Sequence, residues 1–358
     1  MNYNEIRKIT RKIKVGSLFI GGDSAVSIQS MTNTDTHDFE ATYNQVSALE
    51  AAGCDIVRIT APDIESTEVF SYLKKKGIKI PLVADVHFNH KIAVAAIKSG
   101  ADKVRINPGN IGSDDGVREV VDTAKEYGTP IRIGVNSGSV PKELLAKYGH
   151  PTPEALVEAA MYHVELLERY DFHDIVISIK ASNPRDLIES NRILSEKVNY
   201  PLHLGLTEAG FGEKAVVKSS IGIGILLSEG IGDTIRVSLT DDPIKEVSLA
   251  KEILSSLGIS ERRGMDVIAC PTCGRTKIDL IALSREFEKR AKAEGLWDKP
   301  LKVALMGCAV NGPGEAIEAD IGIAGGIGEG LLFKKGEIIE KIPEEKLIDR
   351  LIEEIKLI

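Results

Sequence analysis

Three cysteines in the last quarter of the chain have the residue type and spacing that metal chemistry uses. Two of them lie in Cys-Pro-Thr-Cys at 270–273, and the third lies in Gly-Cys-Ala-Val-Asn-Gly-Pro-Gly-Glu at 307–315. Two thiolates on one turn and a third on a glycine-proline loop can share one ion or one cluster. Because no histidine follows His203, a fourth ligand must be another group, and the nearest candidate is Glu315.

The spacing leaves three interpretations of this cysteine set open. A zinc ion held by three thiolates and a carboxylate would be structural, whereas a thioredoxin-like dithiol at Cys270 and Cys273 would leave Cys308 without a role. An iron-sulfur cluster is favoured, because proline and glycine around the thiolates expose backbone N–H groups that can donate hydrogen bonds to cluster sulfides. Cys54 instead begins an apolar run, and we expect it to be a small buried hydrophobe.

A second chemical signal is a repeated strand pattern that contains arginine. The pattern Asp-x-aliphatic-Arg-aliphatic-polar stands at 55–60, 102–107 and 233–238. Alternate residues of a strand point to opposite faces, so the arginine and the polar residue share one face while the aliphatic residues take the other. The face that packs on helices must be apolar, which predicts that Arg58, Arg105 and Arg236 point to the interior of the sheet structure.

The same parity on two other strands adds Arg132 and Lys180 to this interior face. Five buried cations are costly unless they are compensated, and Asp85 is the clearest inward acid. Arginine suits phosphate oxygens, so the pattern predicts a ligand with several negative charges, such as a diphosphate. The alternative is that structural Asp and Glu side chains at the strand ends neutralise these cations.

Alternating elements must position these residues. Short β-branched runs are predicted as strands at 27–31, 56–60, 82–88, 103–107, 131–136, 175–182, 202–207 and 234–239. Amphipathic stretches between them predict helices at 39–52, 90–99, 117–126, 152–170, 184–197 and 213–228. Eight strand-helix units over about 250 residues are typical of a (β/α)8 TIM barrel, with a doubly wound open sheet as the alternative.

A second domain is predicted after the barrel. The apolar pattern is interrupted near 258–264, which divides the chain into 1–262, a substrate-binding TIM barrel, and 263–358, a small α/β domain that binds the iron-sulfur cluster. Both cysteine sets follow predicted strands, at 267–269 and 302–306, which places them at one edge of a small sheet. A long helix at 277–294, a strand at 320–324 and an amphipathic tail helix at 344–357 complete this α/β domain.

Length and charge restrict the class of protein. The chain has 358 residues with 45 Lys plus Arg against 53 Asp plus Glu, a net charge of −8 that argues against general binding of nucleic acid or an anionic membrane. No signal peptide and no apolar run of membrane length is evident, and four cysteines in such a chain indicate metal or redox chemistry. We therefore expect a cytoplasmic enzyme.

Four motifs together resemble the bacterial 4-hydroxy-3-methylbut-2-en-1-yl diphosphate synthase family. Two contain the cysteines: Cys-Pro-Thr-Cys-Gly-Arg-Thr at 270–276 and Gly-Cys-Ala-Val-Asn-Gly-Pro-Gly-Glu at 307–315. The other two are Val-Arg-Ile-Asn-Pro-Gly-Asn-Ile-Gly at 104–112 and His-Leu-Gly-Leu-Thr-Glu-Ala-Gly at 203–210. The similarity spans the whole chain in the compact two-domain form. It implies reductive ring opening of 2-C-methyl-D-erythritol 2,4-cyclodiphosphate to a linear allylic diphosphate in the non-mevalonate (MEP) pathway of isoprene biosynthesis.

The resemblance also implies a cofactor and partners. A 4Fe-4S cluster would be held by Cys270, Cys273, Cys308 and Glu315, with electrons from reduced flavodoxin or ferredoxin. Glu315 would be the exchangeable, catalytic ligand, because a carboxylate oxygen is harder than a thiolate. The family implies a homodimer in which the cluster domain of one subunit closes over the barrel of the other.

The remaining site residues follow from the same resemblance. Substrate hydroxyl contacts and proton delivery are expected of Asp85, His87 and Glu208. The diphosphate would be bound by Arg58, Arg105, Asn107, Arg132, Asn136, Lys180, Arg236 and Ser238. Two other functions remain alternatives: a pterin-binding barrel transferase with a structural zinc domain, which gives the cysteines no chemistry, and a non-enzymatic iron-sulfur redox carrier, which does not need the inward cations.

Overall fold

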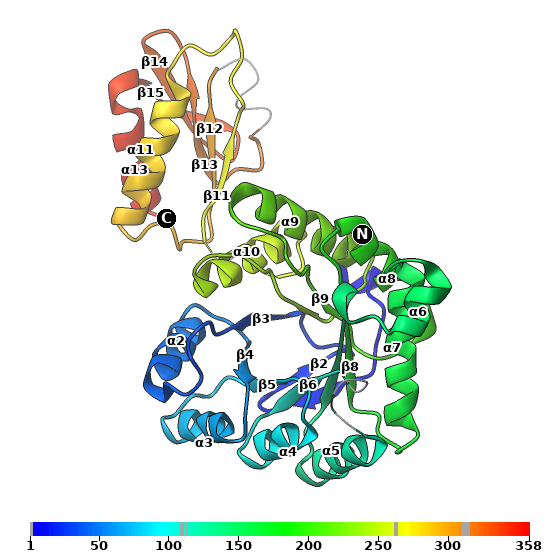
Figure 1. The fold of residues 1–358 in the computed structure, drawn as a ribbon. Helices are drawn as coiled ribbons and strands as arrows, with labels where there is room; N and C mark the ends of the chain where they lie inside the picture. The colour runs from blue at the N-terminus through cyan, green and yellow to red at the C-terminus, as the bar shows by residue number, and fades with distance from the viewer. Residues whose placement is uncertain (1–2, 108–110, 112, 261–263, 309–315) are drawn as a thin grey trace. The chain divides into compact units, whose positions relative to one another are not determined.

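The computed structural model describes residues 3–107, 111, 113–260, 264–308 and 316–358. By its internal contacts the chain divides into two compact units, Met1–Ser260 and Glu261–Ile358. The boundary that the sequence predicts, between 262 and 263, falls on residues outside the described part. Each unit is described here by itself (Figure 1).

The first unit contains a parallel eight-stranded sheet in the order β8-β7-β6-β5-β4-β3-β10-β9. A parallel bridge from Ile177 to Leu202 joins β8 to the β9 side, so the sheet nearly closes on itself. The TIM barrel is thereby confirmed, and the open doubly wound sheet is excluded. Its strands are β3 (Ser27–Met31), β4 (Ile56–Ala61), β5 (Leu82–Val86), β6 (Lys103–Ile106), β7 (Ile131–Asn136), β8 (Ile175–Lys180), β9 (His203–Leu204) and β10 (Thr234–Ile235).

Helices surround the barrel, and most begin at a capping side chain. Asp38, Asn89 and Ser113 accept hydrogen bonds from backbone N–H groups in the first turns of the helices that follow them. Gly128 ends one of these helices with a left-handed φ of 64°. The helices are α1 (Tyr3–Ile6), α2 (Phe39–Ala51), α3 (Glu68–Lys75), α4 (His90–Lys98), α5 (Asp114–Tyr127), α6 (Lys142–Tyr148), α7 (Pro153–Glu168), α8 (Pro184–Lys197), α9 (Gly212–Ser228) and α10 (Pro243–Ser256).

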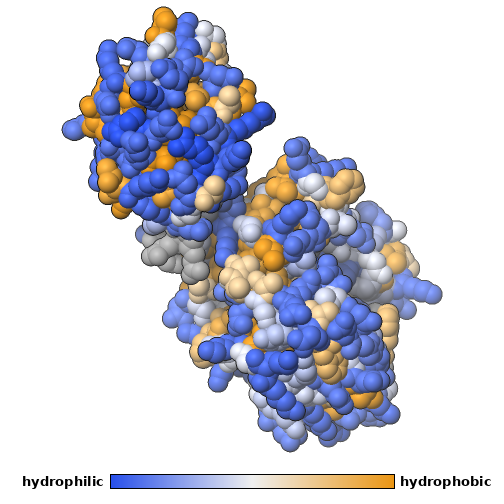
Figure 2. Space-filling model, turned by 90° about the vertical axis from the view of Figure 1, so that its left-hand side faces the viewer, coloured by the Kyte–Doolittle hydropathy of each residue, from blue (hydrophilic) through white to orange (hydrophobic). Residues whose placement is uncertain are grey.

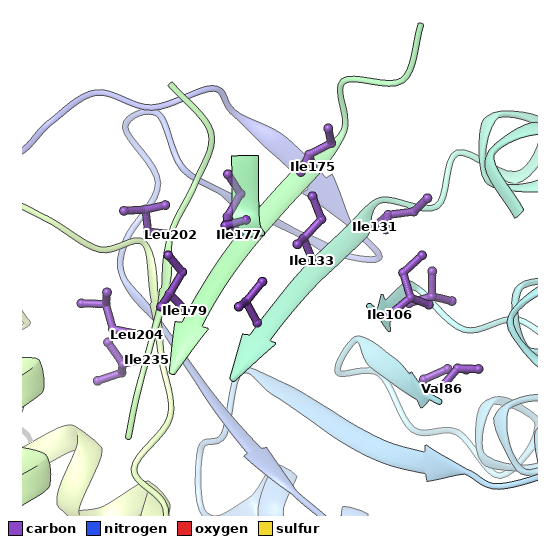
Figure 3. Close-up of a cluster of buried hydrophobic side chains, with 14 of the residues drawn as sticks. Val86, Ile106, Ile131, Ile133, Ile175, Ile177, Ile179, Leu202, Leu204 and Ile235 are labelled. Atoms are coloured by element: carbon purple, nitrogen blue, oxygen red, sulfur yellow. The ribbon is translucent and has the colours of Figure 1, made fainter. Parts of the chain in front are cut away.

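The hydrophobic core of this unit lies between the barrel and its helices. Ile175, Ile177 and Ile179 project together from β8, and the aliphatic residues of the neighbouring strands join them in one buried cluster (Figure 3). Val57 and Ile59 of the first arginine repeat belong to the same cluster. The aliphatic face therefore packs on the helices, and the arginine face is left for the barrel interior.

A short hairpin closes the N-terminal end of the barrel. Strands β1 (Ile13–Val15) and β2 (Leu18–Ile20) pair antiparallel, and Ile13, Val15 and Ile20 pack on Ile56, Val83 and Val176. These three residues lie at or next to the starts of their strands, two or four residues before Arg58, Asp85 and Lys180, the charged residues of the same face. The barrel interior is thus apolar at one end and charged toward the other.

The second unit is a five-stranded mixed sheet in the order β11-β12-β13-β14-β15. Strands β11 (Asp266–Ala269), β12 (Lys302–Met306) and β13 (Ile321–Gly325) are parallel, whereas β14 (Glu329–Lys334) and β15 (Glu337–Pro343) form an antiparallel extension. Helices α11 (Leu280–Ala293) and α13 (Leu347–Lys356) pack on it through Phe287, Leu351 and Ile355. The predicted small α/β domain is confirmed, with β14 and β15 added.

The surface is mainly hydrophilic on the face that Figure 2 shows, with hydrophobic residues in small scattered groups. Among the described residues, no helix combines the length and the apolar character that crossing a membrane requires.

Candidate active site

A polar cavity of about 310 Å³ lies within the barrel where the strands end. We call it the cationic cavity, because Arg58, Arg105, Arg132, Lys180 and Arg236, the five cations of the predicted site, line it. Its walls are Arg58, Asp85, His87, Arg105, Arg132, Gly134, Asn136, Ser178, Lys180, Leu206, Thr207, Glu208, Arg236 and Ser238. The cavity thus brings together ten of the predicted site residues, which come from seven strands or the segments that follow them. On each strand the alternate residues face inward.

Asp85 on β5 stands between two arginines. Its Oδ1 lies 3.2 Å from Arg105 Nη1, and its Oδ2 lies 3.7 Å from Arg58 Nε. Burial alone would raise the pKa of the Asp85 carboxyl, but the two guanidinium groups outweigh burial and hold that pKa below its ordinary value. Asp85 is therefore an anion that orients Arg58 and Arg105.

Arg105 also contacts His87. The His87 Nε2 lies 2.6 Å from Arg105 Nη1, and because arginine can only donate, Nε2 accepts this hydrogen bond. Burial lowers the pKa of the imidazole, and the positive charge of Arg105 lowers it further despite Asp85. His87 is thus neutral, with its proton on Nδ1.

Gly134 makes room for the Arg105 guanidinium. A Cβ at position 134 would stand 2.3 Å from Arg105 Nε and 2.8 Å from Nη2, a contact that real atoms do not make. The absence of a side chain on β7 therefore positions the cation contributed by β6.

Arg236 has a different acidic partner, Glu246 on α10. The Arg236 Nε and Nη2 atoms donate to the two oxygens of this buried carboxylate, both at 3.1 Å, in a two-pronged contact. Ser30 Oγ and the Leu239 backbone N–H also donate to Glu246, at 2.9 and 3.1 Å. Strand parity does not reveal Glu246, because it comes from a helix ten residues beyond Arg236.

Arg132 and Lys180 are buried without an acidic partner among the described residues. Arg132 is 1% exposed, and its Nη1 makes a long hydrogen bond of 3.5 Å to Gln29 Oε1. Its Nε has no hydrogen-bond partner among the described residues. Burial, reinforced by neighbouring cations, lowers the pKa of both side chains well below ordinary values. Such groups are stabilised when an anion binds between them.

Lys103 extends the cationic set deeper into the barrel. It lies two residues before Arg105 on the same face of β6, is fully buried, and its Nζ has no partner among the described residues. Burial lowers its pKa well below the usual value. A two-residue period read over the whole of β6 predicts the inward direction of Lys103, although this residue is not among the predicted site residues.

The remaining predicted substrate contacts lie around the mouth. Asn136, Glu208 and Ser238 line the cationic cavity, whereas Asn107 lines two neighbouring cavities instead. Glu208 has a left-handed φ of 54°, which is uncommon for residues other than glycine.

The cysteines of the second unit lie at the ends of adjacent parallel strands. Cys270 follows β11 and Cys308 follows β12 after one residue, and the Gly307 N–H donates to Cys270 Sγ at 3.2 Å. Backbone N–H groups near Arg275, with the Arg275 side chain, lower the pKa of the exposed Cys273 thiol. These hydrogen-bond donors therefore favour the thiolate form of the cysteines at this edge of the sheet.

The case for a cluster at these cysteines rests on the chemistry of the donor set. No group of three His, Cys, Asp or Glu side chains placed to hold a metal occurs within the described part of the chain. Glu315, the predicted fourth ligand, belongs to 309–315 and lies outside that part. The chemistry of the donor set still fits an iron-sulfur cluster: three free cysteines near exposed backbone N–H groups. Cys54, by contrast, is buried, and burial raises its thiol pKa to about 12, as expected of a core residue.

Two family models match the chain. The GcpE TIM-barrel domain matches residues 10–251, and the GcpE protein C-terminal domain matches residues 266–357.

Named relatives match over nearly the full length. A protein of Clostridium perfringens is 58% identical over 98% of this chain and 99% of its own length, and one of Caldanaerobacter subterraneus is 56% identical over 98% of both. Both are named 4-hydroxy-3-methylbut-2-en-1-yl diphosphate synthase (flavodoxin). Among solved structures, the dihydropteroate synthase of Yersinia pestis matches 69% of this chain and 98% of its own, at 12% identity and a TM-score of 0.48.

Proposed function

The chain belongs to the GcpE family, and from that premise we propose that it is a 4-hydroxy-3-methylbut-2-en-1-yl diphosphate synthase. It opens the ring of 2-C-methyl-D-erythritol 2,4-cyclodiphosphate and forms the linear allylic diphosphate. The reaction consumes two electrons, breaks the C–O bond that closes the ring and expels a hydroxyl group as water. It is a step of the MEP pathway of isoprene biosynthesis.

The excess of cations in the barrel is the observation that carries this proposal. Arg58, Arg105, Arg132, Lys180 and Arg236 line one cavity, while the acids that contact them are Asp85 and Glu246. A cyclic diphosphate brings two negative charges into the space between these side chains. The cations would be stabilised by its phosphate oxygens, with Asn107, Asn136 and Ser238 as hydrogen-bond partners.

The cofactor proposed for the second unit is a 4Fe-4S cluster. Cys270, Cys273, Cys308 and Glu315 would hold it, and it would supply electrons to the substrate one at a time. The contact from the Gly307 N–H to Cys270 Sγ supports this assignment, because such donors stabilise thiolate charge. Glu315, as the one oxygen donor of the set, is proposed as the exchangeable and catalytic ligand.

Proton delivery is assigned to groups at the cavity wall. His87 carries its proton on Nδ1, because Nε2 is occupied by Arg105. From there it can donate to a substrate hydroxyl, and Glu208, which lines the same cavity, is the second residue that we assign to proton delivery. Asp85 is held ionised by its arginines, so we assign it an accepting role toward a substrate hydroxyl.

The partners proposed are an electron donor and a second copy of the chain. The names of the relatives specify flavodoxin, and we propose reduced flavodoxin or ferredoxin for this chain, in the cytoplasm. For the homodimer, in which each cluster domain serves the partner's barrel, support comes from α9. Val217, Ile221 and Ile225 are spaced by four residues and are 55%, 45% and 37% exposed, an apolar stripe that a second copy can cover.

Turnover under anaerobic conditions tests the proposal. Reconstituted protein, photoreduced flavodoxin and the cyclic diphosphate should yield the linear allylic diphosphate by mass spectrometry, and Arg105→Ala should abolish its formation. Arg118→Ala, which removes an exposed arginine of α5, should retain full turnover and serves as the control. A reconstituted protein that leaves the cyclic diphosphate intact would refute the assignment.

The two alternative functions are not favoured. A pterin-binding transferase gives no role to the cysteine domain, and the relatives at 56–58% identity carry the synthase name instead. A redox carrier needs no cationic cavity. Colourless reconstituted protein would favour the first alternative, and failure to bind the cyclic diphosphate would favour the second.

A further inference from the structure

Two further cavities adjoin the cationic cavity, and the proposed reaction uses only the polar residues that they contribute at its edge. The first, of about 250 Å³, shares His87, Arg105 and Asn136 with it. Its other walls include Val86, Phe88 and Ile111, so we call it the apolar lobe.

The second additional cavity is an outer groove of about 670 Å³. It shares Asn107, Gly138 and Ser139 with the apolar lobe. Its apolar walls come from the segment after β7, from α6 and from α7, and they include Val140, Pro141, Leu144, Ala159 and Tyr162. A series of three neighbouring cavities thus leads from a strongly cationic space to a mainly apolar one.

Phe88 lines the apolar lobe and has an unusual conformation. Its backbone has a left-handed φ of 65°, and its side chain is 75% exposed although it is a large hydrophobe. Strained backbone of this kind often lies at active sites and ligand sites. The phenyl ring lies beside His87, with ring centroids 5.9 Å apart, where it can cover the apolar part of a bound ligand.

The wall of the outer groove is largely uncharged where it is buried. His163 is 2% exposed, its Nδ1 has no partner among the described residues, and burial lowers its pKa to about 4. Glu158 is engaged by Lys147 Nζ and Tyr148 Oη, both at 2.7 Å, and Lys142 and Glu143 are exposed at the rim. A hydrocarbon chain can therefore lie along the buried wall.

We propose that linear allylic diphosphates with chains longer than five carbons bind here and compete with the cyclic substrate. The diphosphate occupies the cationic cavity, and the hydrocarbon chain runs through the apolar lobe into the outer groove. The inference rests on the proposed function, because the product of that reaction is itself a linear allylic diphosphate. The enzyme would then be inhibited by elongated compounds of its own product class.

The preference for longer chains follows from the shape of the ligand and from the removal of its hydrocarbon from water. A cyclic diphosphate is compact and suits the cationic cavity alone, whereas a linear chain extends beyond it. Each buried methylene group contributes to affinity, so a chain that enters the lobe and groove should bind more tightly as it lengthens. A chain that points into solvent would gain nothing.

Calorimetric titration of the full-length protein under anaerobic conditions tests the inference. The probes are the cyclic diphosphate, the five-carbon hydroxylated product, ten- and fifteen-carbon linear allylic diphosphates, and the ten-carbon alcohol without the diphosphate. We expect the ten-carbon diphosphate to bind about tenfold more tightly than the five-carbon product. The cyclic diphosphate should displace it, and the alcohol should bind far more weakly.

Substitutions in the two additional cavities test where the hydrocarbon chain of the ligand lies. Phe88→Ala and Tyr162→Asp should each reduce the gain from chain length while leaving the affinity for the cyclic diphosphate within about twofold. Phe19→Ala, which removes an exposed aromatic from the hairpin at the other end of the barrel, should keep the gain.

The outcomes separate this inference from the proposed function. Equal affinity for the five- and ten-carbon diphosphates, with normal binding of the cyclic diphosphate, overturns the inference alone. A gain that survives in both variants also overturns it, since the chain then lies elsewhere. Failure of the cyclic diphosphate to bind would instead overturn the proposed function.

Discussion

Arg105 contacts two groups of different character through one nitrogen. Its Nη1 lies 3.2 Å from the Asp85 carboxylate and 2.6 Å from the neutral His87 ring. The guanidinium is thereby oriented across the cavity, above Gly134, before any ligand arrives. Orientation in advance reduces the entropy that a ligand must overcome when it binds.

Loss of this cation should weaken substrate binding strongly. Arg105→Ala is expected to cost about 2–5 kcal/mol of binding free energy for the cyclic diphosphate, the scale for a desolvated charge pair. Gly134→Ala keeps every charge but displaces the guanidinium, and should weaken binding in the same direction. Calorimetry measures both, with Arg118→Ala as the exposed control. Unchanged affinity in Gly134→Ala would show that the position of Arg105 is unimportant.

Glu246 should prove to be structural at the same site. Glu246→Ala leaves Arg236 buried without its carboxylate, which is expected to lower the free energy of unfolding by about 3–5 kcal/mol. Urea unfolding followed by circular dichroism measures it. Glu252→Ala removes an exposed carboxylate from the same helix and should change little. Equal stability of the two variants would contradict a structural role for Glu246.

At the scale of elements, α7 carries a pH-dependent contribution to stability. Burial lowers the pKa of His163 from 6.5 to about 4, so the folded protein keeps this ring neutral where the unfolded chain protonates it. The contribution is fully present above pH 6.5 and is lost as the pH falls from 6.5 toward 4.

Replacing His163 should therefore reduce the loss of unfolding free energy at acid pH. Between pH 7 and pH 5 the wild-type protein should lose about 2 kcal/mol through this residue, a loss that His163→Leu avoids. Urea unfolding at the two pH values measures the difference. His150→Leu, at an exposed position, should follow the wild-type pH dependence. If His163→Leu follows it too, the ring is protonated in the folded state.

Strand periodicity explains how much of the barrel could be predicted. A two-residue period placed Arg58, Arg105, Arg132, Lys180 and Arg236 on one face, and the structure has all five on one cavity. The predicted strand ends were too long, because the segments at 202–207 and 234–239 leave the sheet after two residues to form the cavity rim. The inward direction of these residues is therefore predicted correctly, although the segments that carry them pair with a neighbouring strand over only two residues.

Long-range partners could not be predicted in this way. Glu246 reaches Arg236 from a helix, and Met31 Sδ lies between Arg58 and Arg236, at 2.8 Å from Arg58 Nη2 and 3.4 Å from Arg236 Nη1. Such contacts depend on how elements pack rather than on any period in the sequence. The antiparallel pair β14 and β15, which turns at Lys335 and Gly336, is also absent from the predicted strands.

At the scale of the whole molecule, each unit has its own core, and the proposed chemistry needs both. The barrel supplies the cations and the second unit supplies the thiols. A homodimer is proposed to bring them into use, and the exposed stripe on α9 is the surface we assign to it.

Introducing a charge into the stripe tests this assignment. Ile221→Glu should convert the protein from dimer to monomer in sedimentation or light-scattering measurements, because a carboxylate at a buried apolar contact is strongly unfavourable. Ile281→Glu, at an exposed position of the second unit, is the control and should remain dimeric. A dimer that persists in Ile221→Glu would place the interface elsewhere.

The most direct test of the account is the content of iron and acid-labile sulfide per chain after anaerobic purification. We predict about four of each in the wild-type protein, with broad visible absorption, and loss of both in Cys308→Ser but not in Cys54→Ser. One zinc ion per chain, or full iron and sulfide content in Cys308→Ser, would contradict the proposal that Cys270, Cys273 and Cys308 hold the reducing centre.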